Sequence, residues 1–61
     1  MNYRIYFKKK FYDITRGYIN YVNLRKVLEI HIIANLVVIQ FPRCSAEFKL
    51  KDIKSILRLK G

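Results

Sequence analysis

Cysteine, histidine and tryptophan are nearly missing from this chain of 61 residues, which contains Cys44, His31 and no tryptophan. A single cysteine cannot close an internal disulfide, and one cysteine with one histidine cannot supply the four ligands of a structural zinc site. A chain of this length forms one domain (1–61) and buries only about 60% of the surface that its unfolded form exposes. Small domains usually compensate with disulfides, a metal or a partner subunit. We therefore expect no metal and no cofactor, and a homo-oligomer is the stabilising device that remains open.

Acidic residues are also scarce, with four against thirteen lysines and arginines, which gives a formal net charge of +9. Such an excess favours an anionic partner, either a nucleic acid (DNA or RNA) or an acidic protein. An AT-rich genome would raise the lysine content without any such partner. It would not explain why only four acids occur, so the charge gives weak support for an anionic partner.

Export signals and long apolar runs are missing as well. Residues 1–10 are rich in tyrosine, arginine and lysine and hold no apolar stretch of the roughly 7 to 15 residues found in signal peptides. The apolar stretch 28–41 is shorter than the roughly 20 residues that span a bilayer, and four polar residues, Glu29 among them, interrupt it. We expect a cytoplasmic protein with no transmembrane segment, in keeping with its low cysteine content.

The first third of the chain predicts two strands. In Tyr3–Phe7 apolar and polar residues alternate, which is the period of a half-buried strand. The segment Phe11–Leu24 is ambiguous, because its apolar residues fit a helical stripe while its tyrosine, isoleucine, threonine and valine residues favour strands. We predict a second strand and an irregular crossing there, with a turn at Arg16-Gly17.

The middle of the chain predicts a hairpin. Leu28–Ile32 places apolar residues on one face and Glu29 and His31 on the other. Ala34-Asn35 then offers a tight turn, because asparagine tolerates the positive φ that hairpin turns require.

The returning strand is predicted over Leu36–Phe41, where Gln40 is the one polar residue. Such a strand is typical of the centre of a sheet, covered on both sides. Pro42 cannot donate a ladder hydrogen bond and ends the strand. After a turn over 42–45, alternation resumes in Ala46–Leu50 and predicts a further strand.

The C-terminal segment fits two patterns. Asp52 suits the N-cap of a helix with Ile53, Ile56 and Leu57 on its apolar side. Alternatively, Leu57 and Leu59 alternate with basic residues as in a strand. A single helical turn that leads into a short strand accommodates both. The whole chain then predicts an all-β fold, an antiparallel meander of about five strands. A small closed barrel, or a sheet stacked on its copy in a dimer, would cover its apolar face.

Residue types suited to catalysis do not form a recognisable group. His31 and Glu29 share a polar strand face without a predicted pocket, and Cys44 beside Arg43 resembles an ordinary thiol in a turn. Because nucleophilic catalysis requires a nucleophile, a base and an orienting group within reach, we predict that the protein is not an enzyme.

The first strand suggests a binding surface. If its odd-numbered residues face inward, positive charges and aromatic rings alternate on the outward side, where cations can contact phosphates while rings stack on bases. The competing explanation is structural, because tyrosine is common in strands and lysine on an edge strand prevents aggregation. The candidate nucleic-acid-binding residues are Arg4, Tyr6, Lys8, Lys10 and Tyr12.

Two functions remain open from the sequence. In the first, this surface binds nucleic acid without strict sequence preference, since no helix-turn-helix, zinc-finger or RRM motif is present. In the second, the protein is an interaction module that docks an acidic host or phage protein, or its own copy, through a sheet edge. A further cationic set extends the first surface or keeps the C-terminal segment solvated, namely Lys49, Lys51, Lys54, Arg58 and Lys60.

The run FKLKDIKSI (48–56), preceded by the apolar strand 36–41, resembles the C-terminal part of short β-sheet proteins encoded by phages and prophages of Gram-positive bacteria. The likeness covers the last third to half of the chain, and the segment 11–24 has no counterpart in it. It implies an all-β accessory protein of a phage or prophage and transfers no site residue.

Overall fold

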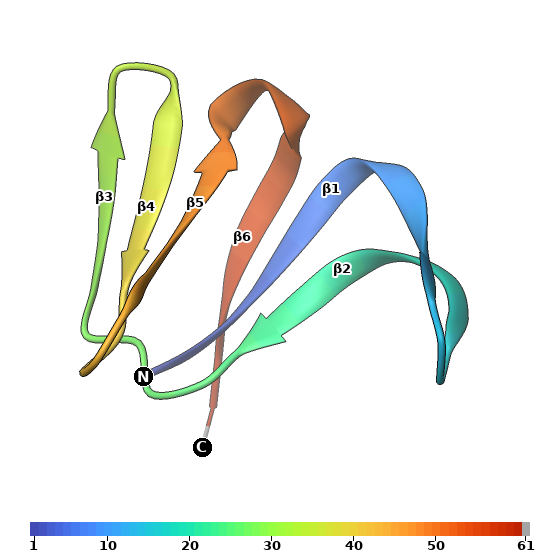
Figure 1. The fold of residues 1–61 in the computed structure, drawn as a ribbon, viewed down its shortest axis with the longest axis horizontal. Coiled ribbons are helices and arrows are strands. Elements are labelled where there is room, and N and C mark those ends of the chain that lie inside the picture. Colours follow the sequence, from blue (N-terminus) through green and yellow to red (C-terminus); the bar gives the residue numbers. More distant parts are fainter. Residues whose placement is uncertain (61) are drawn as a thin grey trace.

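The computed structural model describes residues 1–60 as two three-stranded antiparallel sheets (Figure 1). One sheet has the order β2-β1-β6 and the other β3-β4-β5. The all-β fold and the one short helical turn predicted from the sequence are confirmed. The strands number six within residues 1–60, and they do not form one meander, because β6 pairs with β1. The elements are β1 (Asn2–Asp13), β2 (Gly17–Leu24), β3 (Glu29–Ile33), β4 (Leu36–Gln40), β5 (Ser45–Lys49), the 3-10 turn η1 (Leu50–Asp52) and β6 (Ile53–Leu59).

The β1–β2 hairpin is long and strongly bent (Figure 1). Its turn covers residues 14–16 and is held by Asp13, whose Oδ1 accepts hydrogen bonds from Thr15 N (2.9 Å), Thr15 Oγ1 (2.7 Å) and Arg16 N (3.1 Å). Gly17 follows at φ 79°, a left-handed conformation that glycine adopts without strain. The turn predicted at Arg16-Gly17 and the second strand are therefore present, and the helical alternative is excluded for this segment.

The crossing between the two sheets is tied to the amino terminus. Val27 is 1% exposed. Its N–H donates to Met1 O (2.9 Å), and the Met1 ammonium donates to Val27 O (3.1 Å). One residue later, Leu28 N donates to Gln40 O (2.8 Å). The start of the chain, the crossing and β4 are thus linked by backbone hydrogen bonds.

The β3–β4 hairpin has the predicted two-residue turn, but the residue with positive φ differs. Ala34 adopts φ 53°, and Asn35 is not among the residues with positive φ. β4 is central, as predicted. Val37 and Ile39 on one face are fully buried, whereas the residues of the opposite face are half-buried. The prediction that both faces of this strand are covered therefore holds for one face.

The C-terminal segment corrects the predicted helix cap. Asp52 is the last residue of η1, and the capping position belongs to Lys49, which makes no side-chain cap hydrogen bond. Ile53 and Ile56, predicted on the apolar side of a helix, lie in β6. The short turn simply redirects the chain from β5 to β6.

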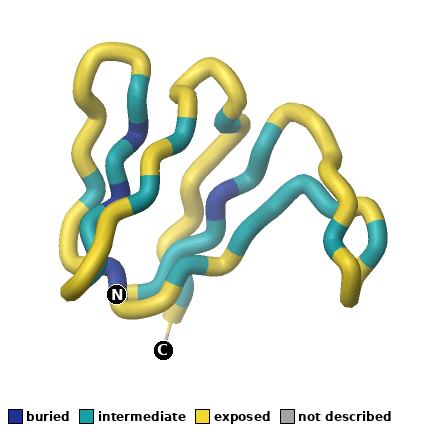
Figure 2. Tube along the Cα trace, viewed as in Figure 1, coloured by how far each residue is buried: buried dark blue, intermediate teal, exposed yellow. Residues whose placement is uncertain are grey.

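The core lies between the two sheets and is small (Figure 2). Ile5 of β1, Val27 of the crossing, and Val37 and Ile39 of β4 are at most 1% exposed. Half-buried residues surround them, among them Tyr3, Phe7, Val22, Phe41, Phe48 and Ile53. The inward positions predicted for the first strand, Tyr3, Ile5 and Phe7, therefore do face the core.

Candidate nucleic-acid interface

Arg4 and Tyr6 lie on one face of the β1–β2 hairpin, opposite Asn23 and Tyr21 of β2. Arg4 Nε donates to Asn23 Oδ1 (2.8 Å), and Arg4 Nη1 donates to the Tyr6 hydroxyl (3.3 Å). The Arg4 guanidinium also lies 4.6 Å from the Tyr21 ring centre. Arg16 contacts the same ring at 5.1 Å. We call these five residues the tyrosine face.

Three members of the tyrosine face, Arg16, Tyr21 and Asn23, were not among the candidates from the sequence. Tyr21 and Asn23 join it because the hairpin register places each opposite a predicted residue. Arg16 reaches it from the hairpin turn. The sequence does not reveal how β1 and β2 are paired, because β1 contains extra residues, described below, whose number cannot be read from alternation.

The bulge occupies residues 7–10 of β1. Tyr6 pairs with Tyr21, but the next paired residue, Phe11, lies opposite Ile19, so residues 7–10 face residue 20 alone. The insertion is odd, and an odd slip inverts which side chains share a face. The side chain of Asn20 supports the irregular backbone, since its Nδ2 donates to Phe7 O (3.4 Å).

The bulge corrects the predicted row of outward residues. Lys9 and Phe11, which alternation would place in the interior, are both exposed. Of the five candidates, Arg4 and Tyr6 belong to the tyrosine face, Lys8 and Lys10 line a pocket at the bulge, and Tyr12 packs beside Tyr18 near the hairpin tip. The predicted residues thus occupy three neighbouring parts of the hairpin and no single row.

The pocket at the bulge has a volume of about 510 Å³. Its apolar part comprises Phe7, Phe11, Val22 and Phe48. The Phe7 ring lies 5.8 Å from Phe11 and 5.5 Å from Phe48, measured between ring centres. The three phenylalanine rings therefore form a continuous aromatic group that joins β1 to β5.

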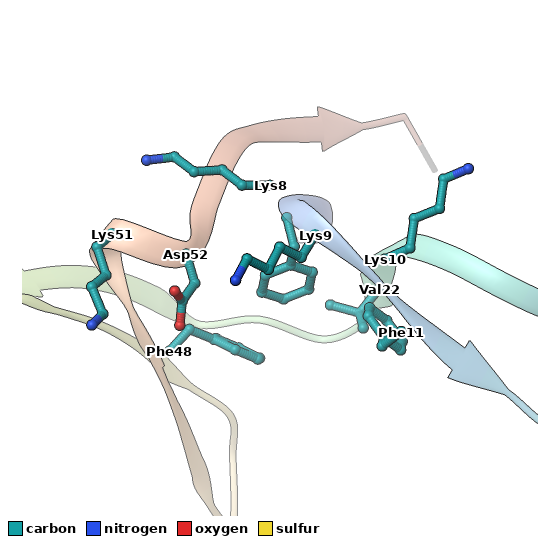
Figure 3. A pocket seen from close by; sticks show the side chains of 9 residues that line it. Lys8, Lys9, Lys10, Phe11, Val22, Phe48, Lys51 and Asp52 are labelled. Atoms are coloured by element: carbon teal, nitrogen blue, oxygen red, sulfur yellow. The ribbon is translucent and has the colours of Figure 1, made fainter.

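Four lysines and one aspartate complete the pocket lining, namely Lys8, Lys9, Lys10, Lys51 and Asp52. The ammonium groups of Lys8 and Lys10 extend away from each other on opposite sides of the pocket (Figure 3). Within residues 1–60, no salt bridge engages any of these lysines. Their positive charge is therefore not neutralised by ion pairs within the described part of the chain. We call this site the lysine-rimmed pocket.

The hairpin tip presents two exposed tyrosines. Tyr12 is 65% exposed and Tyr18 is 73% exposed, and their ring centres are 5.5 Å apart at an angle of 72°. The edge-to-face arrangement leaves ring surface open to solvent. All five tyrosines of the chain, Tyr3, Tyr6, Tyr12, Tyr18 and Tyr21, lie within β1 and β2.

Asp13 offsets the charge of Arg16 near the tip. Hydrogen bonds from the Thr15 hydroxyl, the Thr15 N–H and Arg16 hold the pKa of Asp13 well below its usual range. The Arg16 guanidinium lies 3.1 Å from Asp13 Oδ2. This arginine is paired and also stacked on Tyr21. Of the other hairpin cations, Arg4 lies on the tyrosine face, and Lys8, Lys9 and Lys10 lie at the bulge, where most of the free positive charge is found.

Other residues with chemical potential lie elsewhere in the fold. His31 Nε2 is 2.8 Å from Glu29 Oε2 on β3, and Cys44 is an exposed free thiol. No group of three or more histidine, cysteine, aspartate or glutamate residues suited to a metal ion occurs in the described part of the chain. Of the C-terminal cationic set, Lys51 alone lines the lysine-rimmed pocket.

Comparisons with protein families, with curated proteins and with solved structures find no match to this chain. The resemblance to phage and prophage proteins therefore stays a prediction from the sequence. Residues 1–60 contain no helix of the length and apolar character needed to cross a membrane.

Proposed function

We propose that this protein is a non-enzymatic, cytoplasmic binder of single-stranded nucleic acid without strict sequence preference. The observation that carries the proposal is the lysine-rimmed pocket, which combines three phenylalanine rings with four lysines that form no salt bridge within residues 1–60. Cations that follow a phosphate backbone, next to aromatic rings that stack on bases, are the usual means by which proteins hold single strands.

Energetics favour a single strand over a duplex at this pocket. Stacking of one base on an aromatic side chain contributes about 1–3 kcal/mol. The bases of a duplex are already stacked on one another, so a duplex would offer phosphates to the lysines but no base to the Phe7 and Phe11 rings. Stacking on a phenylalanine ring is open to every base, since each has a π-face, which supports tolerance of sequence.

The rest of the hairpin extends the proposed surface. Tyr12 and Tyr18 provide a second set of exposed rings. In this proposal, Tyr6 contributes less than the sequence predicted, because Arg4 and Tyr21 already contact its side chain. The net charge of +9 would accelerate the encounter with any polyanion.

Fluorescence anisotropy with labelled oligonucleotides tests the proposal. Three probes of equal length are compared at two salt concentrations: a single strand, a duplex, and a single strand with abasic sites. We expect the intact single strand to bind most tightly and its affinity to fall as salt rises. The proposal is wrong if no probe binds at low salt.

Charge-removing variants locate the surface. The slope of log K against log salt is negative, and each lost lysine–phosphate contact reduces its magnitude by about 0.7 for a single strand. We expect Lys9→Gln and Lys10→Gln each to show this decrease. Arg43→Gln is the matched control, since it also removes one positive charge but lies in the β4–β5 turn, at the opposite end of the strands from η1 (Figure 1). An equal decrease in all three variants would indicate an effect of net charge alone.

The contribution of base stacking is tested with Phe11→Ala. Phe11 is 36% exposed and is not part of the fully buried core, so the fold should tolerate its truncation. Loss of one stacked base corresponds to about 1–3 kcal/mol, or roughly a five- to 150-fold weaker affinity for the intact strand. The abasic strand should bind the variant and the wild type equally. A similar loss with the abasic strand would show that Phe11 acts through the fold and not through a base.

A further inference from the structure

β3 is an edge strand without the usual protection. Within residues 1–60 it is hydrogen-bonded to β4 alone, in a continuous register (Figure 1). Ile32 and Ile33 are 62% and 61% exposed, and Leu28, just before the strand, is 53% exposed. Edge strands of monomeric proteins are normally blocked by lysine, proline or a bulge. β3 has none of these, and its one acidic residue, Glu29, lies 2.8 Å from His31 of the same strand.

Charge distinguishes β3 from the other edges of the two sheets. β6 carries Lys54 and Arg58, β5 ends in Lys49, and two guanidinium groups lie on the Tyr21 ring of β2. By contrast, residues 28–41 contain no lysine or arginine in a chain of net charge +9. A second copy of this cationic chain would therefore meet the least repulsion at β3.

The surface area of the protein also favours association with a partner. The accessible surface of the chain is 4960 Å². A monomer of 7.4 kDa is expected to expose about 4,200 Å². Because the fully buried core consists of four side chains, added burial of apolar β3 residues would stabilise the fold.

We propose that β3 pairs with β3 of a second copy, antiparallel about a two-fold axis at His31. The two sheets β3-β4-β5 then form one six-stranded sheet with β3 at its centre. In this register Ile30 lies opposite Ile32 of the second copy, and Glu29 lies opposite Ile33 of the second copy. Both copies contribute the same strand to the interface, which is the requirement of an isologous dimer. The lysine-rimmed pocket is lined by residues of β1, β2, β5 and η1 and by none of β3, so it remains free.

Analytical ultracentrifugation of the full chain tests the dimer. An interface built on one edge strand falls at the small end of protein interfaces, so the dimer should appear as concentration rises towards about 1 mM. Ile32→Lys places a lysine on the free edge and should give a monomer. Leu57→Lys is the matched control, because Leu57 is 50% exposed on β6, and it should dimerise like the wild type. Circular dichroism confirms that both variants remain folded.

A disulfide tests the register. In the Cys44→Ser background, His31→Cys places one thiol on the proposed axis, where antiparallel neighbours approach within the Cα distance of about 4.4–6.8 Å that a disulfide allows. Mild oxidation should give a covalent dimer rapidly. Ile14→Cys in the same background, with a position 88% exposed at the hairpin tip, should not. The proposal is overturned if the wild type is monomeric up to about 1 mM, if Ile32→Lys dimerises normally, or if the two cysteine variants cross-link at the same rate.

Discussion

Ile39→Val tests whether the two sheets pack around the small core. Ile39 is 0% exposed and lies between Ile30 and Ala46 of the neighbouring strands. Removing one buried methylene group costs about 0.5–1.5 kcal/mol. The total stability of a domain of 61 residues is about 3–9 kcal/mol, so this change removes between about one twentieth and one half of it. For a domain this small, each kcal/mol lowers Tm by about 4–8 °C, and we expect a decrease of about 2–12 °C.

Thermal unfolding followed by circular dichroism measures this shift. Ile14→Val is the matched control, because it removes the same group from a side chain that is 88% exposed. A surface substitution of this kind should change stability by less than about 0.5 kcal/mol. Protein concentration must be equal in all samples, since association shifts Tm by mass action. Equal shifts in the two variants would refute the placement of Ile39 between the sheets.

Two further predictions concern the turns. Ala34 holds φ 53°, a conformation that costs a non-glycine residue about 1–2 kcal/mol. Ala34→Gly removes this cost but adds about 0.4–1 kcal/mol of unfolded-chain entropy, so we expect a small rise in the urea midpoint, and a fall would contradict the turn geometry. The folded pKa of Asp13 is lowered, so its stabilising contribution is present above its unfolded pKa of about 3.9 and is lost as pH falls through the folded pKa. The difference in Tm between wild type and Asp13→Asn should therefore be largest near neutral pH and shrink below about pH 4, whereas a constant difference would show that the carboxylate charge is not involved.

The local alternation of the sequence predicted the strands where one face is buried and the backbone is regular. Tyr3–Phe7 and the strands near 28–32 and 46–50 were found in this way, whereas the strand near 36–41 was predicted from its apolar run. The division into two sheets was not, because β6 pairs with β1 from the opposite end of the chain. Strand order depends on such long-range pairing, and alternation describes a strand without naming its neighbour. The positive φ was assigned to Asn35 on its intrinsic preference, but the turn places it on Ala34.

The candidate site shows the same limit more sharply. Arg4 and Tyr6 were identified because they precede the bulge, where alternation still holds. The lysine-rimmed pocket needs Phe48 and Lys51, which β5 and η1 bring beside β1. No local pattern links these two residues to Lys9. Phe48 and Lys51 come close to β1 because of the order of the strands in the two sheets, and that order depends on pairing between strands distant in sequence.

The bulge in β1 accounts for two properties of the lysine-rimmed pocket, the packing of its phenylalanine rings and the exposure of its lysines. In a regular strand, the Cα atoms of Phe7 and Phe11 would lie about 13 Å apart, too far for their rings to pack closely. Lys9 between them would point into the same interior without a partner, which is costly for an unpaired charge. The bulge bends β1, so the two rings approach to 5.8 Å while Lys9 is exposed together with Lys8 and Lys10. The close packing of the two rings and the exposure of the lysines therefore have the same cause. A change that restored regular pairing over residues 7–10 would remove both at once.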